Sequence, residues 1–225
     1  MMNRLAGKRI LVTQADEYMG PATCEIFPEF GAEIIADTSD LTEPGRAQDL
    51  IADVGEIDVL IANLAAPPSL GVAATDMDDK VWQDMFDIMV HPLHRLCRAA
   101  LPQMVARKKG KIVVFGSATG LKAMQGLSAY SAARHAQVGY VRAVGMEAAA
   151  QNVQVNLIAQ NFVENPIYFP PDFTTTPVFK ELLKQVPAGR LATAREDILF
   201  AVFLASDESD FFVGQAIPFS GGWAQ

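Results

Sequence analysis

Three side chains near the middle of the chain have the types and spacing of a proton-transfer site. Ser117 ends the apolar segment Lys111–Ser117, and Tyr130 and Arg134 follow on a segment with helical spacing. Residues four apart on a helix share a face, so this phenol and guanidinium can converge. A fixed positive charge stabilises a phenolate, and arginine keeps its proton at working pH. We expect Tyr130 to act as a general base, with Arg134 as a fixed charge and Ser117 orienting the substrate.

Short apolar segments alternate with helical segments along the whole chain. We expect one α/β domain over residues 1–225, with a Rossmann-like, doubly wound parallel sheet and helices on both faces, because most strands are apolar on both sides. Ser117 then lies at the carboxyl edge, where such sheets bind ligands. The predicted strands are Lys8–Thr13, Ala32–Asp37, Ile57–Asn63, Lys111–Ser117, Val153–Ala159 and Ala216–Phe219. The predicted helices are Gly20–Phe30, Asp78–Arg107, Ser128–Gln151 and Ala194–Ser206.

Prolines are expected to interrupt two of the predicted helices, and proline and threonine are frequent in one further segment. Pro28 is expected to end the first helix early, and Pro92 and Pro102 to kink or split the second. The segment Asn165–Pro177 is rich in proline, threonine and aromatic residues, which favours a loop or lid.

The turn after the first predicted strand stands where a Rossmann-type fold receives the pyrophosphate of a dinucleotide. Glycines are needed there, since phosphate must approach bare backbone amides at a helix N-terminus. Here only Gly20 is glycine, while Gln14 and Tyr18 carry large side chains. We therefore expect no cofactor. Asp37 stands where a ribose-binding acid belongs, and we interpret it as a relic or a helix cap.

The chain resembles the short-chain dehydrogenase/reductase superfamily, in which a strand-end serine is followed by Tyr-x-x-x-Lys and the first turn reads Thr-Gly-x-x-x-Gly-x-Gly. Here Arg134 replaces the lysine, and the turn runs from Thr13 through Tyr18 to Gly20. Both departures together resemble the halohydrin dehalogenases, with Ser-x12-Tyr-x3-Arg and Thr-x4-Phe/Tyr-x-Gly, and most closely their smaller B-type members. The likeness extends to Phe219-Ser220-Gly221-Gly222.

Other positions agree with that resemblance. The helix asparagine of the reductases aligns near Met89, which offers no useful hydrogen bond. Between Asp37 and Ile57 there is room for one short helix, whereas the reductases usually have a helix, a strand and a helix there. Asn63 could position the catalytic helix as in the reductases, or cap a turn.

The resemblance implies cofactor-independent conversion of vicinal halohydrins to epoxides with halide release, and the reverse opening of epoxides by small anions. It places the halide in a pocket formed by the loop Gln160-Asn161-Phe162-Val163, with Tyr18 closing the other side. Two alternatives remain open. One is an NAD(P)-dependent short-chain reductase with a degenerate cofactor turn, and the other is a non-catalytic Rossmann-like binding protein.

Composition restricts the partners. The net charge of −8 argues against nucleic acid and anionic membranes. No apolar run has the length of a membrane span or signal segment, and the two cysteines are far apart, so we expect a reducing cytoplasmic location and no metal site. The resemblance implies a homotetramer, and small residues on the third predicted helix would suit close helix packing between subunits or onto the sheet. They are Ala143, Gly145, Ala148, Ala149 and Ala150.

Overall fold

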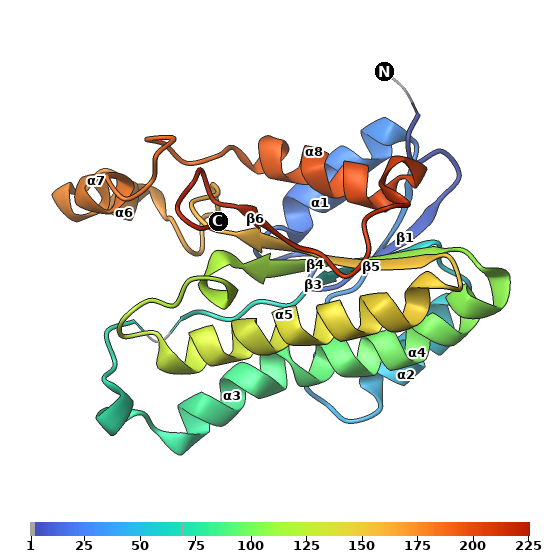
Figure 1. Ribbon diagram of the computed structural model, residues 1–225, viewed down its shortest axis with the longest axis horizontal. Coiled ribbons are helices and arrows are strands. Elements are labelled where there is room, and N and C mark those ends of the chain that lie inside the picture. Colours follow the sequence, from blue (N-terminus) through green and yellow to red (C-terminus); the bar gives the residue numbers. More distant parts are fainter. Residues whose placement is uncertain (1–2, 69) are drawn as a thin grey trace.

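Six parallel strands form the centre of the molecule, in the order β2-β1-β3-β4-β5-β6 (Figure 1). The structure is a computed structural model and describes residues 3–68 and 70–225. This parallel order confirms the predicted doubly wound α/β fold. The strands are β1 (Arg9–Val12), β2 (Glu33–Ala36), β3 (Val59–Asn63), β4 (Gly110–Ser117), β5 (Val153–Gln160) and β6 (Ala216–Phe219).

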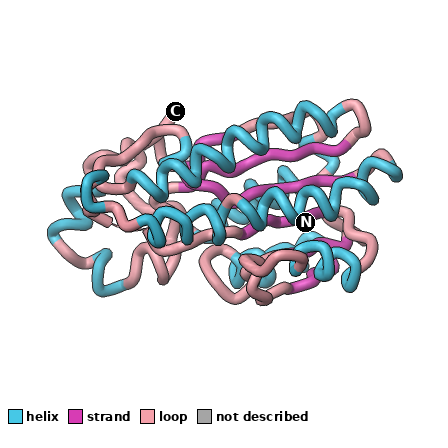
Figure 2. Tube along the Cα trace, turned by 90° about the horizontal axis from the view of Figure 1, so that it is seen from below, coloured by secondary structure: helices cyan, strands magenta, loops and turns pink. Residues whose placement is uncertain are grey.

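Helices cover both faces of the sheet (Figure 1), and the view from below in Figure 2 shows the helices of one face lying across the strands. One face carries α1 (Gly20–Ile26) and α8 (Ala194–Ala205). The other carries α2 (Arg46–Val54), α3 (Asp79–Met89), α4 (His91–Arg107) and α5 (Ser128–Ala149). A buried apolar cluster lies on each face, because the strands present apolar side chains in both directions.

The prolines act on the helices in three ways. Pro28 lies in a 3₁₀ turn, Phe27–Phe30, and α1 ends before it at Ile26, as expected. The predicted helix 78–107 is split at Val90, and Pro92 lies in the first turn of α4, where its missing N–H costs nothing. Pro102 lies inside α4, which continues to Arg107, so of the predicted kink or split this proline does not cause a split.

Strands β1 to β5 each differ from the prediction by one or two residues at one or both ends, and the differences at β3 and β5 involve specific contacts. β3 begins at Val59 because the amide of Ile57 donates to the side chain of Gln103 instead of the sheet. β5 extends to Gln160, which was expected in the following loop. There Gln160 pairs with Ser117 on one side and Phe219 on the other, so it lies at the same sheet edge as the predicted catalytic serine.

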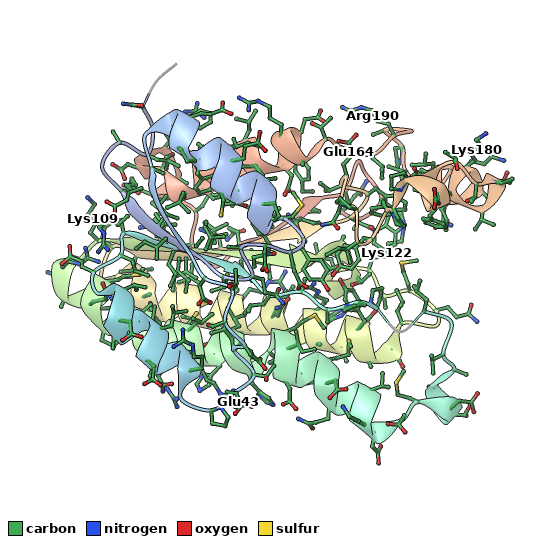
Figure 3. The ribbon with its side chains drawn as sticks, turned by 180° about the vertical axis from the view of Figure 1, so that it is seen from behind. Glu43, Lys109, Lys122, Glu164, Lys180 and Arg190 are labelled. Carbon is green, nitrogen blue, oxygen red and sulfur yellow. The ribbon has the colours of Figure 1, made fainter. Side chains whose placement is uncertain are left out.

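The segment Asn165–Pro177, which we call the lid, is partly helical, whereas the sequence predicted a loop or lid. It contains α6 (Pro171–Thr174) and leads into α7 (Pro177–Leu183), whose first turn is capped by the side chain of Thr176. In Figure 3, Lys180 marks this unit where it projects beyond the carboxyl ends of the strands. Within the described residues, none of the helices combines the length and apolar character that a membrane span requires.

Candidate active site

The three residues predicted to transfer a proton line one pocket of about 200 Å³ at the carboxyl end of the sheet. Ser117 is the last residue of β4, while Tyr130 and Arg134 lie on consecutive turns of α5. Their exposed fractions are 8%, 6% and 2%, respectively. The pocket is smaller than the usual range of small-molecule sites, roughly 300–1,000 Å³, which favours a ligand of few heavy atoms.

Arg134 is a buried, fixed cation beside Tyr130. The central carbon of its guanidinium lies 5.0 Å from the centroid of the Tyr130 ring. One terminal nitrogen donates to the carbonyl of Leu64 at 3.0 Å, the carbonyl of Phe115 at 3.3 Å and Oε1 of Gln137 at 2.9 Å. Burial by itself lowers the pKa of Arg134, but two neighbouring phenols outweigh it and raise the pKa. The positive charge therefore remains in place throughout the working range of pH.

Ser117 is oriented by Thr119, a residue that the sequence reasoning missed. Oγ of Ser117 accepts from the Thr119 amide at 3.2 Å and is paired with the Thr119 hydroxyl at 2.9 Å. A serine oxygen that accepts two hydrogen bonds keeps its own hydrogen for donation. The signal that could have found Thr119 is its spacing of two residues after a serine at a strand end, which is typical of a serine–threonine turn.

Tyr168, in the lid, is a second residue that sequence reasoning did not assign to the site. Its hydroxyl lies 3.4 Å from the hydroxyl of Tyr130 and donates to the carbonyl of Ala66 at 3.1 Å. It also accepts from Arg134 at 3.5 Å. The ring packs on Tyr18 with 5.1 Å between centroids. Burial, followed by the neighbouring Tyr130, raises the pKa of Tyr168 well above its ordinary value.

The turn between β1 and α1 keeps a glycine-like backbone but carries side chains. Gln14 and Tyr18 have φ angles of 43° and 50°, in the left-handed region that favours glycine. The Gln14 amide group is fastened to the backbone of Ala65, donating to its carbonyl at 3.2 Å and accepting from its amide at 2.8 Å. Asn63 secures the turn from β3 by donating to the carbonyls of Gln14 and Glu17. Of the two roles expected for Asn63, the structure shows the turn-binding one.

The residues of this turn do not fit the dinucleotide that the fold commonly binds. Pyrophosphate approaches bare backbone amides, but this turn carries the side chain of Gln14, which is bonded to Ala65, and that of Tyr18, which lines the candidate pocket. Burial, with Glu17 nearby, raises the pKa of Tyr18 to about 12, so this wall of the pocket stays neutral. The glycine at Gly20 has a local packing reason: an added Cβ would lie 2.2 Å from the Gln14 carbonyl oxygen.

Asp37 directly follows β2 and Met89 is the last residue of α3, and each makes hydrogen bonds within the protein. Asp37 accepts from the amide and hydroxyl of Ser39, so it caps a turn after β2 and not a helix, which corrects one expectation. The Met89 side chain is fully buried, and its carbonyl accepts from Gln137 at 2.8 Å. Gln137 thereby links the Arg134 guanidinium to the end of α3.

The predicted halide pocket is brought together at the end of β5. Tyr18, Gln160, Asn161, Phe162 and Val163 all line the same cavity as the catalytic residues. The ring of Phe162 packs against Phe169 from the lid at 5.8 Å and Trp223 at 6.4 Å between centroids. These contacts form an aromatic wall around the pocket.

The backbone amides of this loop are not equally open to an anion. The amide of Asn161 donates to the Phe219 carbonyl at 3.0 Å, and the amide of Phe162 donates to Oδ1 of Asn161 at 2.9 Å. Within residues 3–68 and 70–225, no hydrogen-bond acceptor pairs with the amide of Val163. Asn161 therefore contributes no backbone donor, and its side chain must move before Phe162 can contribute one.

The side chain of Gln160 is hydrogen-bonded to a buried carboxyl group. Its amide nitrogen donates to Oδ2 of Asp197 at 2.5 Å, while Oδ1 of that aspartate has no hydrogen-bond partner among the described residues. Burial, only partly offset by the Gln160 hydrogen bond, raises the pKa of Asp197 to about 7. In the described part of the chain, no group of three or more His, Cys, Asp or Glu residues is arranged to hold a metal ion.

The sequence relatives are oxidoreductases. A family model described as enoyl-(acyl carrier protein) reductase matches residues 4–224. The 3-oxoacyl-[acyl-carrier-protein] reductase of Escherichia coli is 28% identical over 244 aligned positions, covering 96% of this chain and 97% of that protein. A dehydrogenase/reductase of Danio rerio, SDR family member 6, is 29% identical and covers 99% of each chain.

Solved structures give a mixed set of neighbours. A structure described as a dehalogenation enzyme has a TM-score of 0.88 and 28% identity, covering 98% of this chain and all (100%) of that one. A 3-oxoacyl-[acyl-carrier protein] reductase of Brucella melitensis with bound NAD has a TM-score of 0.87 at 22% identity, covering 98% and 92% of the chains, a likeness in fold alone. With the strand order and the matched span of 4–224, these findings establish that the chain belongs to the short-chain dehydrogenase/reductase superfamily, in the family described as enoyl-(acyl carrier protein) reductase.

Proposed function

We propose that the protein is a cofactor-independent halohydrin dehalogenase, which closes vicinal halohydrins to epoxides and opens epoxides with small anions. The observation that carries the proposal is the pair of side chains in the β1–α1 turn. Gln14 is bound to Ala65, and Tyr18 lies against the catalytic pocket, where a reductase of this fold requires cofactor space. Arg134 supports it, because a guanidinium committed to carbonyls of Leu64 and Phe115 is poorly suited to a nicotinamide ribose.

Without hydride transfer, proton transfer is the chemistry that these side chains support. Ser117 donates to the oxygen of the substrate hydroxyl, and Tyr130, as phenolate, removes its proton. The alkoxide oxygen forms a bond to the neighbouring carbon while the carbon–halogen bond breaks, giving an epoxide and a halide ion. Because nucleophile and electrophile belong to one molecule, orientation in the small pocket replaces a bimolecular encounter.

The departing anion is assigned to the pocket at the end of β5. Val163 offers a backbone amide there, and Phe162 offers a second once the Asn161 side chain moves. Backbone amides recognise charge and size more than the element, so azide, cyanide and nitrite are expected to enter as well. In the reverse direction the anion attacks an epoxide carbon and Tyr130 protonates the alkoxide. The neighbour described as a dehalogenation enzyme supports this chemistry by its 28% identity over nearly the whole chain.

A second candidate is an NAD(P)H-dependent reductase of the short-chain type. The family model and the reductases of Escherichia coli and Danio rerio favour it, and the identity to them is of the same order as that to the dehalogenation enzyme. We prefer the dehalogenase because Gln14, Tyr18 and Arg134 all depart from what reduction needs, and a degenerate cofactor turn alone does not account for the change at Arg134.

The deciding experiment compares both activities in one preparation. Purified protein mixed with a small vicinal chloroalcohol, without added cofactor, is expected to release chloride and form the epoxide, while Tyr130→Phe is expected to release chloride at least about 100-fold more slowly. The same protein, given NADPH and a 3-oxoacyl thioester, is expected to leave NADPH unconsumed. Consumption of NADPH without chloride release would establish the reductase in place of the dehalogenase. Neither activity, with no nucleotide binding, would point to a non-catalytic protein.

A further inference from the structure

The Tyr168 hydroxyl lies between the Ala66 carbonyl, a neutral acceptor, and the hydroxyl of Tyr130, the proposed base. Its oxygen is 3.1 Å from the Ala66 carbonyl and 3.4 Å from the Tyr130 oxygen, with a nitrogen of Arg134 at 3.5 Å. A phenol has one hydrogen to donate, so Tyr168 can serve Ala66 or Tyr130 but not both.

Local structure of the lid holds Tyr168 in this place. Oδ1 of the buried Asn165 accepts from the amides of Ile167 and Tyr168 at 2.8 and 3.2 Å, which fixes the backbone just before the ring. Packing on Tyr18 then fixes the ring itself. These contacts lower the entropy cost of presenting one hydroxyl group to the site.

The protonation state of Tyr130 decides which acceptor is better. While Tyr130 is a neutral phenol, it can donate to Tyr168, and Tyr168 donates to Ala66. Once Tyr130 loses its proton, its oxygen only accepts, and a hydrogen bond to a charged oxygen is roughly twice as strong as one to a neutral group. Burial raises the pKa of Tyr168 well above its ordinary value, so Tyr168 keeps a hydrogen to donate.

The other groups that face Tyr130 do not duplicate this contact. Arg134, on the same helix, lies over the ring and supplies charge. Tyr18, from the β1–α1 turn, has a pKa of about 12 and stays neutral, with Glu17 behind it. The β4 end presents the neutral hydroxyl of Ser117, and α3 presents apolar side chains, including Met85 and Met89.

We propose that Tyr168 is a positioning residue that donates a hydrogen bond to the Tyr130 phenolate and so lowers the pH at which the base forms. The reaction that this phenolate serves rests on the function proposed above. The hydrogen bond itself does not depend on that function.

The test is a spectrophotometric titration of phenolate that needs no substrate. The chain has four tyrosines, and burial raises the pKa of the other three, Tyr18, Tyr140 and Tyr168. Because Tyr130 also contributes to the raised pKa of Tyr18 and Tyr168, the difference between wild type and Tyr130→Phe is read at its lowest-pH step, which reports Tyr130. The same difference measured in the Tyr168→Phe background is expected to titrate about 1–2 pH units higher, the loss of one hydrogen bond to a charged group.

Tyr18→Phe is the matched control. It also removes one phenolic hydroxyl beside Tyr130, but among the described residues that hydroxyl makes no hydrogen bond, so the Tyr130 titration is expected to stay in place. Circular dichroism across the pH range checks that each variant is folded. If Tyr168→Phe does not fold, the Asn165→Ala variant, which releases the backbone before Tyr168, is expected to give a smaller shift in the same direction.

The activity profile supplies the second readout. In Tyr168→Phe the acidic limb of chloride release is expected to move upward with the titration, and activity to recover at alkaline pH. A role limited to holding the lid would lower activity at every pH and leave the titration unchanged, which would overturn the proposal. Wild type that releases no chloride while its Tyr130 titration still depends on Tyr168 would overturn the proposed function alone.

Discussion

At the scale of single residues, the proposed mechanism needs one group that takes a proton, Tyr130, and one fixed positive charge, Arg134. Tyr130→Phe removes the only group proposed to take the substrate proton and is expected to lower kcat about 10²–10⁴-fold, the usual contribution of a general base. Arg134→Lys keeps a charge, but one ammonium cannot reproduce the planar contacts to Leu64, Phe115 and Gln137, so a large loss and an alkaline shift are expected. Chloride release measured from pH 6 to 10 checks both. Near wild-type release by Tyr130→Phe would refute the mechanism.

Asn161 offers a separate test of the anion pocket. Asn161→Asp keeps an oxygen for the Phe162 amide but adds a negative charge beside the proposed anion. Like charges at such distances repel by several kcal/mol at low effective dielectric, so inhibition by bromide is expected to weaken about 10-fold or more. The neutral variant Asn161→Ala is expected to keep bromide affinity within a few-fold. Measuring bromide inhibition of azide-dependent epoxide opening gives both values, and equal affinity in Asn161→Asp would place the anion elsewhere.

At the scale of elements, β5 and α8 share a buried acid. Asp197 lies in the first turn of α8, where the helix dipole favours a carboxylate, but burial prevails and raises its pKa to about 7. The folded state therefore binds this proton more tightly than the unfolded state, in which an aspartate has its ordinary pKa near 4. The Asp197 contribution to the free energy of unfolding is then full below about pH 4 and is lost as pH rises to about 7.

Asp197→Asn is expected to flatten that pH dependence. The amide keeps an acceptor for Gln160 but has no proton to lose, so the decline in unfolding free energy between about pH 4 and 7 should shrink, by at most on the order of 4 kcal/mol. Urea unfolding at several pH values measures it. An unchanged slope would show that Asp197 is already ionised throughout this range.

The β1–α1 turn is the element on which the prediction of cofactor independence rests. Gln14 and Tyr18 occupy a turn that must be bare for pyrophosphate, so calorimetry with millimolar NADH or NADPH is expected to detect no binding. Replacing both residues by glycine is not expected to create reductase activity, because Arg134 and Met89 remain unsuited. Micromolar binding by the native protein would instead favour the reductase.

At the scale of the whole molecule, one side of α5 packs closely within the subunit and another side is exposed. An added Cβ at Gly145 would lie 2.5 Å from Gly214 and 2.9 Å from the Val155 carbonyl, so this glycine, with the buried Ala148, serves close packing within the subunit. Ala143 and Ala150 are exposed, and Met146 is 75% exposed on the same helix. The homotetramer stays a prediction. Light scattering at micromolar concentration is expected to give about four times 24.3 kDa, and a clean 24.3 kDa species would contradict it.

Much of the fold and the location of the catalytic residues could be predicted from the sequence. Short apolar runs predict strands of a sheet that is covered on both faces, because alternate side chains then enter one apolar layer or the other. The i, i+4 spacing places Tyr130 and Arg134 on one helix face. Glycine is the residue for bare backbone, so its replacement by Gln14 and Tyr18 is visible without coordinates. These are local properties of the chain, and the sequence determines them directly.

The tertiary structure alone decided which partners those residues meet. Tyr168 reaches Tyr130 across 38 residues of sequence, and Asp197 reaches Gln160 across 37. The Asn161 side chain accepts from the Phe162 amide, and Thr119 orients Ser117. The physical reason is that hydrogen bonds depend on distances of a few tenths of an ångström and on burial, which emerge only when the lid, α8 and the strand ends have packed together.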